Sequence, residues 1–493
     1  MNETESVDDF SDGSSCSSYS GWSSYSCISS GSSYSCISSG SIYSCISSGS
    51  CCSCISSCSN CSSISGVSCN LENEHSENEL LELETDVYEN INDYIDEFAI
   101  QYSNPKFHES LIDDVSQLII MVGVETGLFD NEDDDESLHK FVEKRADCFF
   151  EMGIAPLRSY PADYIVPPQS QETKDILKIQ LTYLLNLPQQ TQRTPEWYST
   201  RHGLMTASNI YKIFGSQCLY NSFICDKCKP LLVPTIENES KCVNTESPMH
   251  WGVKYEPLTQ MIYKILYCSR EPIAEFGCIQ HPEFSCIGAS PDGINIDSTS
   301  NHYGHMIEIK NIVNREITGI PSEAYWVQTQ IQMEVCGLDM CDFVETRFKE
   351  YKDEEDFWME EGNDDGGNEK EFRGIILYFV HKTAVGSTPL YEYRIVDSDS
   401  YNKLKHKRYT DDWINETIAE KQNYSLYKTI YWYLDEISCV IIPRNKVWFN
   451  SAIEKILDTW KVIEKERVDG FSHRLPKKIN KVKPSICVIK LDY

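Results

Sequence analysis

The residues best suited to chemistry in this chain are two carboxylates and an ammonium, Asp292, Glu308 and Lys310. Apolar and polar residues alternate over 307–312, which is the period of a half-buried strand. Glu308 and Lys310 therefore project from one face, and Ile307 and Ile309 anchor the other. An ordinary surface salt bridge on an exposed strand is the alternative for this pair.

Asp292 is expected to join these two residues through a hairpin. Pro291-Asp292-Gly293 precedes a second alternating segment at Ile294 and Ile296, and residues 297–301 form a turn cluster. The hairpin brings Asp292 beside Glu308 and Lys310. Carboxylates at close range cannot both ionise cheaply without a cation, and such hard oxygen ligands suit Mg²⁺ or Mn²⁺.

Two helices must flank this hairpin. The first runs from Trp251 to Leu266 and carries Glu256 immediately before Pro257, so a helix starts or kinks there. The second begins at Ser322 and ends at Gly337. Tyr325, Gln328 and Gln332 share one of its faces, and Gln330 and Gln332 are the less certain site candidates because one helix cannot aim three glutamines inward.

Four motifs, which follow one another along the chain in the order typical of one family, carry a resemblance. Asp292 with Glu308-x-Lys310 resembles the PD-(D/E)XK nuclease signature. Residues 197–208, WYSTRHGLMTAS, resemble the WxxxRxGxxTAS opening of the lambda-exonuclease/YqaJ viral recombinase family. Residues 251–256, WGVKYE, and 325–330, YWVQTQ, resemble its WGxxxE and YxxQxQ helices. Together the motifs cover roughly 140 residues.

The resemblance implies an α/β fold with a restriction-endonuclease-like core, a mixed central β-sheet flanked by helices. It implies a Mg²⁺- or Mn²⁺-dependent deoxyribonuclease, a 5′→3′ exonuclease on double-stranded DNA ends in viral recombination or repair. Asp292, Glu308, Lys310, Glu256 and Gln328 are then the catalytic residues. One or two ions are held by Asp292, Glu308, the backbone carbonyl of Ile309, and Glu256 directly or through water.

A terminal phosphate site is implied by the same resemblance, in which the residues matching Arg201 and Ser208 hold the 5′ phosphate of the DNA end. Thr194 is expected to cap a helix that starts at Pro195, and Ser208 to cap the next helix. A guanidinium and a hydroxyl at a helix start suit a phosphate. The plainer alternative is a surface arginine and an ordinary cap.

The partners implied are double-stranded DNA ends, a single-strand annealing protein and further copies of the chain. The second function class kept open is a catalytically silent nuclease-fold DNA-binding or virion structural protein. No apolar run is long enough for a membrane span, and the N-terminus does not resemble a secretory signal. An intracellular protein of the host cytoplasm or a viral replication site, either packaged in virions or not, is expected.

The charge distribution is compatible with DNA binding although the net charge is −33. Residues 1–187 hold 32 acidic and 7 basic residues, whereas residues 401–493 hold 12 acidic and 18 basic ones. A phosphate-binding groove needs only local positive charge. Arg474, Lys477, Lys478, Lys481 and Lys483 form a basic tail that either follows the DNA backbone or is simply solvated.

Composition divides the chain into four regions. Residues 1–70 are a disordered Ser/Cys-rich repeat tail, because each nine-residue unit offers too little apolar area to fold. Residues 71–187 are an acidic helical region. Residues 188–400 are the nuclease core, with a cysteine-containing insertion at 216–248 and an acidic loop at 350–371. Residues 401–493 are a helical extension with the basic tail.

The 22 cysteines are expected to be free thiols, as in other intracellular chains. Cys218, Cys225, Cys228 and Cys242 are the candidates for a zinc site, although their spacing is irregular and contains a single CxxC. The cysteines beyond Lys310 are too scattered for an iron–sulfur cluster.

Overall fold

A computed structural model of the chain describes residues 76–129, 135–192, 194–231, 244–268, 273–359, 372–383, 388–396 and 403–476. Four sequence predictions fall wholly or mostly outside these residues. They are the Ser/Cys-rich tail, most of the acidic loop at 350–371, the cysteine at position 242 and the four lysines of the basic tail.

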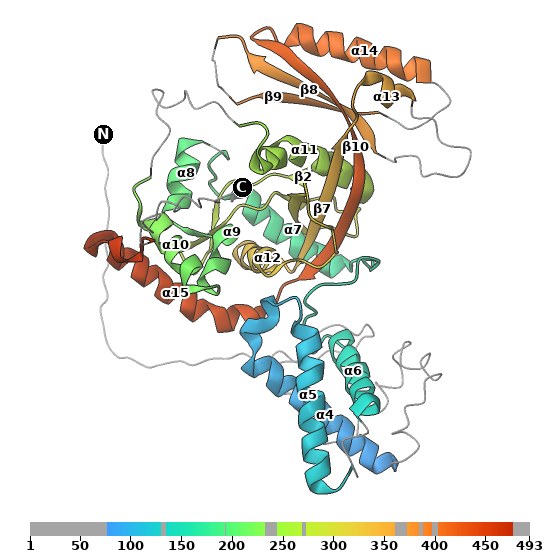
Figure 1. The fold of residues 1–493 in the computed structure, drawn as a ribbon, viewed down its shortest axis with the longest axis vertical. Coiled ribbons are helices and arrows are strands. Elements are labelled where there is room, and N and C mark those ends of the chain that lie inside the picture. Colours follow the sequence, from blue (N-terminus) through green and yellow to red (C-terminus); the bar gives the residue numbers. More distant parts are fainter. Residues whose placement is uncertain are drawn as a thin grey trace, which may run out of the picture. The chain divides into compact units, whose positions relative to one another are not determined.

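The core of the chain is a mixed seven-stranded sheet with the strand order β2-β5-β6-β7-β10-β8-β9. The β6–β7 pair is parallel and the other pairs are antiparallel. The strands are β2 (Ile273–Ala274), β5 (Gly293–Asn295), β6 (Met306–Asn311), β7 (Met340–Glu350), β8 (Arg373–His381), β9 (Leu390–Val396) and β10 (Tyr424–Pro443). The predicted α/β fold with a mixed sheet flanked by helices is therefore confirmed (Figure 1).

A second, three-stranded sheet has the order β1-β4-β3 and leads directly into the hairpin that carries the acidic residues. Its strands are β1 (Met205–Thr206), β3 (Ile279–Gln280) and β4 (Ile287–Ala289). β1 pairs with β4 in parallel, which brings the segment after Arg201 next to the segment before Asp292.

The helices that surround the sheets are, in chain order, α4 (Glu77–Glu97), α5 (Phe107–Thr126), α6 (Asp135–Glu151), α7 (Gln171–Asn186), α8 (Pro195–His202), α9 (Ala207–Ile210), α10 (Gln217–Cys228), α11 (Pro248–Tyr267), α12 (Glu323–Cys336), α13 (Glu354–Met359), α14 (Lys403–Glu420) and α15 (Lys446–Asp469). Three short 3-10 helices are η1 (Ala99–Ser103), η3 (Tyr211–Ile213) and η6 (Ser472–Arg474).

The two faces of β6 are covered by different helices. Ile307 and Ile309 pack with Tyr263 of α11 in one apolar cluster. Val327 and Ile331 of α12 belong to the main core on the other face. α12 ends at Gly337, whose φ of 63° is left-handed, and the chain turns there directly into β7. One strand therefore carries apolar residues toward α11 and polar ones toward α12.

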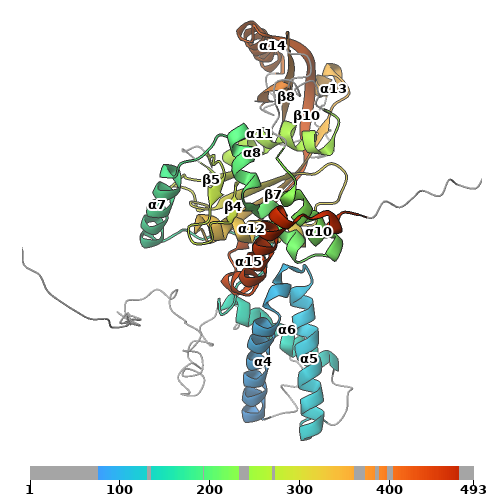
Figure 2. The same cartoon turned by 90° about the vertical axis from the view of Figure 1, so that its left-hand side faces the viewer.

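The predicted helical region before the core is confirmed by α4 to α7, and α4, α5 and α6 lie side by side in both views (Figures 1 and 2). Ser76 and Glu79 form a capping box at the start of α4. Arg158 connects this region to the core, because its Nη2 donates to Ser103 O at 3.0 Å and to Pro321 O at 2.6 Å. Pro321 directly precedes the N-cap of α12, so the added helices help to hold the start of that helix.

The prediction of a helical extension after residue 400 is wrong in part. α14 and α15 are helices, but Tyr424–Pro443 is the twenty-residue strand β10, which lies between β7 and β8 in the sheet. Its pairing register shifts between Leu426 and Lys428 and again between Leu434 and Glu436. These irregularities break the two-residue alternation by which a strand is recognised in a sequence.

Two smaller predictions also need correction. The acidic segment 350–371, expected to be a loop, contains the helix α13, whose Phe357 is buried. Ser208 was expected to cap a helix, but it lies inside α9, whose N-cap is Thr206. The cap at Thr194 is confirmed, since its hydroxyl accepts a hydrogen bond from Trp197 N.

No helix among the described residues combines the length and apolar composition needed to span a bilayer.

Close packing of β8 against β9 gives a first prediction. An ideal Cβ at Gly374 would lie 2.0 Å from the backbone oxygen of Arg394 on β9 and 2.8 Å from the Trp432 ring. We expect Gly374→Ala to lower the free energy of unfolding by about 1–3 kcal/mol, because a backbone atom cannot move aside like a side chain. Urea denaturation measures this. Gly252→Ala is the control, since nothing lies within 4 Å of its Cβ; equal losses in both variants would contradict the prediction.

Candidate active site at the β5–β6 hairpin

The β5–β6 hairpin brings the predicted acidic residues together. β5 and β6 pair in antiparallel fashion, with Gly293 opposite Ile307. Asp292 directly precedes β5, and its Oδ2 accepts a hydrogen bond from Ile309 N at 2.8 Å. The carboxylate of Asp292 is therefore fixed beside the peptide that separates Glu308 from Lys310. The predicted hairpin is confirmed, and the backbone carbonyl of Ile309 stays a predicted metal ligand.

Glu308 is buried and is held by three donors from its own strand and from α12. Lys310 Nζ donates to Oε1, and Gln328 Nε2 donates to the same oxygen at 2.7 Å. Gln332 Nε2 donates to Oε2 at 2.8 Å. The two glutamines lie four residues apart on one helix face, and both orient this carboxylate. Gln330 points elsewhere, because its Nε2 donates to Pro443 O at 3.0 Å.

The charges at this point strongly affect one another. Burial raises the pKa of Asp292 well above its ordinary value, and the neighbouring Glu308 and Glu256 carboxylates raise it further. Burial alone would lower the pKa of Lys310, but Glu308 and Asp292 raise it above its ordinary value. Lys310 therefore carries its positive charge here and balances part of the negative charge of the acids.

Glu256 lies on α11 near this pair, close enough for its charge to raise the pKa of Asp292. Pro257 lies inside α11 rather than at its start, so the helix runs through the Glu-Pro step. Gln260, one turn after Glu256, donates from Nε2 to Asp292 O at 3.0 Å. α11 thus braces the backbone of Asp292, and it carries Glu256, whose charge acts on the Asp292 carboxyl.

Arg201 reaches the same region from the end of α8. Its Nη1 donates to Ser290 Oγ at 2.9 Å, two residues before Asp292, and its guanidinium lies 4.4 Å from the centre of the Trp197 ring. Burial lowers the pKa of Arg201, while Asp292 and Glu308 are near enough to raise it slightly. The predicted phosphate-binding arginine therefore lies next to the acidic site.

Sequence reasoning missed two contributors to this site and left a third uncertain. Ser290 is the partner of Arg201, Gln332 is the second glutamine on Glu308, and the buried Glu345 pairs with Arg315. Of the two residues that were missed, only Ser290 had a usable sequence signal, which is its position two residues before Asp292. Glu345 lies beside Lys310 only because β6 and β7 pair in register across 35 residues of sequence.

Residues 196–339 match the family model for the YqaJ-like viral recombinase domain. This segment is similar to that domain. It contains all four motifs and every predicted catalytic or phosphate-binding residue. The resemblance drawn from the sequence motifs is thus confirmed for this part of the chain.

Known proteins similar to a larger part of the chain are few and diverged. An uncharacterized protein, R354, of Acanthamoeba polyphaga mimivirus is 27% identical over 307 residues, which are 57% of this chain and 54% of the relative. The chain thus spans about half the length of that curated relative. Two crystal structures of an alkaline exonuclease from Laribacter hongkongensis, one with dAMP, are 22% and 23% identical, cover 46% of this chain and 94% of theirs, and have TM-scores of 0.23.

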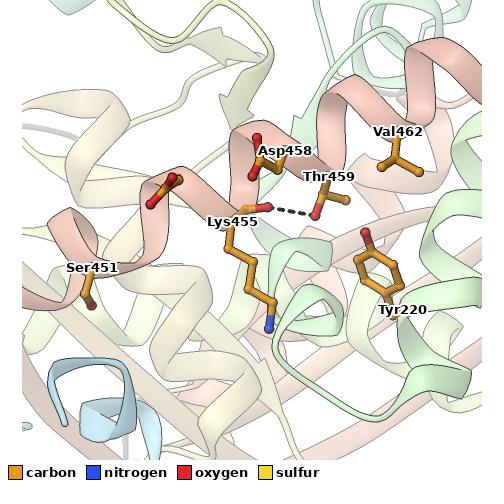
Figure 3. Close-up of a pocket in the computed structure, with 7 residues that line it drawn as sticks. Tyr220, Ser451, Lys455, Asp458, Thr459 and Val462 are labelled. Carbon is orange, nitrogen blue, oxygen red and sulfur yellow. Dashed lines mark hydrogen bonds between the residues drawn. The ribbon is translucent and has the colours of Figure 1, made fainter. Parts of the chain in front are cut away.

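Two hollows lie on the described surface. One, of about 880 Å³, borders the site of the YqaJ-like domain, since Ser208 and Gln328 line it together with Tyr325 and Arg315. The other, of about 340 Å³, lies along α15 between Tyr220 and Lys455, and no predicted site residue lines it (Figure 3). Of these two hollows, only the larger is lined by predicted site residues.

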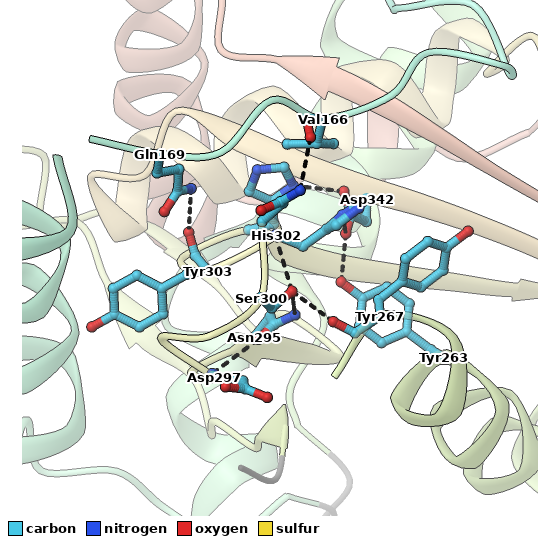
Figure 4. A network of polar contacts seen from close by, with 12 residues as sticks. Val166, Gln169, Tyr263, Tyr267, Asn295, Asp297, Ser300, His302, Tyr303 and Asp342 are labelled. Atoms are coloured by element: carbon cyan, nitrogen blue, oxygen red, sulfur yellow. Dashed lines mark hydrogen bonds and ion pairs between the residues drawn. The ribbon is translucent and has the colours of Figure 1, made fainter. Parts of the chain in front are cut away.

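A second polar cluster lies on the opposite face of the sheet. Asp342 of β7 is level with Ile307 of β6, so its side chain is on the α11 face (Figure 4). Its carboxylate accepts from Tyr263 OH at 2.5 Å and lies 2.7 Å from His302 Nδ1 and 2.8 Å from His305 Nδ1. Burial would raise the pKa of Asp342, but His305 and His302 hold it well below its ordinary value.

This cluster is the place among the described residues where three metal-ligand atoms lie within 4.8 Å of one another. Its separations of 2.7 and 2.8 Å between nitrogen and oxygen are hydrogen-bond distances. Ligand atoms around a tetrahedral zinc ion lie about 3.3 Å apart at ordinary Zn–N distances. We interpret the cluster as a buried hydrogen-bond network that attaches the β5–β6 loop to β7.

The cysteines proposed for zinc do not form such a group in the part of the chain that the structure describes. Cys225 is buried on α10, Cys228 is half-buried and Cys218 is exposed. Burial raises the pKa of both Cys225 and Cys228, which favours the neutral thiol over the thiolate that zinc binds. The fourth predicted ligand lies outside the described residues.

The Asp342 network gives a prediction about stability and pH. Asp342→Asn should lower the free energy of unfolding at pH 7 by about 3 kcal/mol, because it removes the charge that pairs with two buried histidines. A carboxylate whose pKa is lower in the folded than in the unfolded protein stabilises the folded state at pH values above its unfolded-state pKa. This stabilisation is lost as the pH falls. The difference between wild type and variant should therefore shrink below about pH 4.

Urea denaturation at several pH values between 3 and 7 measures this difference. Asp339→Asn, which changes an exposed carboxylate just before β7, is the control and should change stability by less than about 0.5 kcal/mol. A difference for Asp342→Asn that stays constant from pH 7 to pH 3 would contradict the role of its ionised form.

Proposed function

We propose that this protein is a metal-dependent DNA nuclease, most specifically a 5′→3′ exonuclease acting on double-stranded DNA ends in viral recombination or repair. The observation that carries this proposal is the meeting of Asp292, Glu308 and Lys310 at one point, next to Arg201. The matched YqaJ-like viral recombinase domain supports the same function class. A silent DNA-binding protein is the weaker alternative, because the acids and the lysine are all retained.

The residues present fit a hard divalent cation. Asp292 is buried beside two other carboxylates, and burial with these like charges raises its pKa. A divalent ion at this place would neutralise the acids and allow all of them to ionise. Asp292, Glu308 and the Ile309 carbonyl would hold Mg²⁺ or Mn²⁺, with Glu256 contributing directly or through water. A bound ion of this kind supplies an activated water and a neutralised phosphate.

The protein's own residues position the reacting groups. Gln328 and Gln332 fix both oxygens of Glu308, so this carboxylate cannot rotate away from the site. Lys310 remains an ammonium, because nearby acids raise its pKa. It therefore acts as a charged hydrogen-bond donor that orients the attacking water and stabilises negative charge on the phosphate, and not as a neutral base.

The 5′→3′ direction of digestion would depend on how the protein binds the terminal phosphate of the DNA. Arg201, with Ser208 and the observed partner Ser290, would bind the 5′ phosphate of a DNA end. The 880 Å³ hollow is lined by Ser208 and by Gln328, whose amide donates to Glu308, so it borders both parts of the site. A terminal nucleotide could occupy it with its phosphodiester at the acids. The annealing-protein partner and the homo-oligomer stay predictions.

The catalytic assignment is tested by substitutions that keep shape and remove charge. Asp292→Asn, Glu308→Gln and Lys310→Met should each reduce the degradation of linear duplex DNA in Mg²⁺ by about 10³-fold or more, since each removes roughly 4 kcal/mol of transition-state stabilisation. Release of acid-soluble nucleotide measures the rate, and EDTA should abolish it. Asp458→Asn, an exposed carboxylate on α15, is the control. Equal rates of DNA degradation in wild type and all three variants would rule out the proposed nuclease site.

Polarity is tested separately with end-labelled duplexes. A 5′ label should appear in mononucleotides at the earliest times, whereas a 3′ label should stay in long fragments until late in the reaction. Arg201→Gln should slow attack on 5′-phosphorylated ends by about tenfold or more, because a charge-assisted contact to phosphate is lost. Cleavage of closed circular DNA as fast as linear DNA would instead indicate an endonuclease.

A further inference from the structure

A cluster of three cations lies around the C-terminal end of α8, and it includes residues that no motif contains. Lys227, from the helix α10 in the cysteine-containing insertion, donates from Nζ to Arg201 O at 2.8 Å. Arg467, from α15, donates from Nη2 to His202 O at 3.0 Å and from Nε to Lys227 O at 3.0 Å. Segments distant in sequence therefore place Lys227 and Arg467 beside Arg201.

The cations of this cluster form no ion pair with an acid. Among the described residues, no carboxylate forms a salt bridge with Arg201, Lys227 or Arg467. Two acidic side chains that lie next to these residues in the sequence are engaged with other partners. Asp226 pairs with Lys229 at 3.0 Å, and Glu466 pairs with Arg474 at 2.6 Å.

Lys227 has the environment of a binding residue rather than of a solvated lysine. Burial lowers the pKa of Lys227 to about 8, and the like charges of Arg201 and Arg467 contribute to this shift. Cys278 is near both Lys227 and Arg201, and burial keeps its thiol neutral by raising its pKa. Lys227 and Arg201 are therefore two cations without an ion-pair partner beside a neutral thiol, and this arrangement favours the binding of an anion between them.

We propose that Lys227 supplies the second positive charge of the terminal phosphate site, so that the site selects a 5′-phosphate monoester over a 5′-hydroxyl end. A phosphate monoester carries about −1.5 to −2 charges at pH 7, more than Arg201 alone can balance. This inference rests on the terminal phosphate site of the proposed function. Arg467 acts as a positioning residue, because it holds the carbonyl groups at the ends of both α8 and α10.

The simpler explanation is that Lys227 only caps the carbonyl at the end of α8. Lys227→Gln separates the two roles, because the amide can still donate to Arg201 O but carries no charge. Lys229→Gln is the matched control, since Lys229 is exposed and only two residues away. Lys227→Arg should restore the charge.

The experiment compares initial rates on linear duplexes that differ only in a 5′-phosphate or a 5′-hydroxyl. The rate ratio for the two ends should fall about tenfold in Lys227→Gln, recover in Lys227→Arg and stay at the wild-type value in Lys229→Gln. A parallel loss on both ends, with an unchanged ratio, would show a structural role and overturn the inference.

The wild-type protein provides a measurement that does not depend on a variant folding. Its preference for the 5′-phosphate should decline between pH 7 and pH 9.5 as Lys227 loses its proton, while the phosphate stays dianionic. The other groups facing Lys227 are Arg201 and His202 of α8, Arg467 of α15, Cys278, and Asp226 and Lys229 of its own segment. A preference that is constant over this range would overturn the inference.

Failure of the nuclease proposal is distinguishable from failure of this inference. Fluorescence anisotropy with the same two duplexes in EDTA measures binding without cleavage. If wild type cleaves neither duplex, the nuclease proposal fails, and the binding ratio of wild type to Lys227→Gln still decides the role of Lys227. If wild type cleaves DNA but shows no 5′-phosphate preference in rate or binding, the Lys227 inference alone fails.

Discussion

Burial of like charges at the β5–β6 hairpin is the constraint on which the rest of this structure depends. Asp292 and Glu308 lie in a place where burial already raises the pKa of Asp292, and the Glu308 carboxylate makes ionisation of Asp292 still more costly. The fold compensates by surrounding Glu308 with Lys310, Gln328 and Gln332. Each donor also fixes the direction of an oxygen atom. The arrangement therefore costs stability and at the same time produces a rigid oxygen-rich site.

Much of this site could be predicted because it depends on short-range periodicity. Alternation over 307–312 determines which side chains of β6 share a face, and the turn after Ile296 determines that Asp292 returns beside Glu308. Helical spacing correctly grouped Gln328 with Gln332. It could not show what Gln330 contacts, because the bond from Gln330 to Pro443 O depends on the position of β10.

The remaining parts could not be predicted, because they depend on contacts between distant segments. β10 contains two shifts of register, so its aromatic and β-branched residues do not alternate as a regular strand requires. Aromatic and β-branched residues favour a strand by composition, but the interrupted alternation conceals it. The cluster of Arg201, Lys227 and Arg467 has no local pattern at all. It exists because α10 and α15 both end beside the last turn of α8.

The two faces of β6 and β7 show why similar residues have different roles. On the α11 face, Asp342 is surrounded by Tyr263, His302 and His305, so its charge is balanced and both its oxygens are engaged. On the α12 face, Asp292 and Glu308 share a single lysine, and burial leaves the pKa of Asp292 raised. Excess negative charge therefore remains only on the second face. A buried site with excess negative charge attracts a divalent cation, whereas a balanced one stabilises the fold.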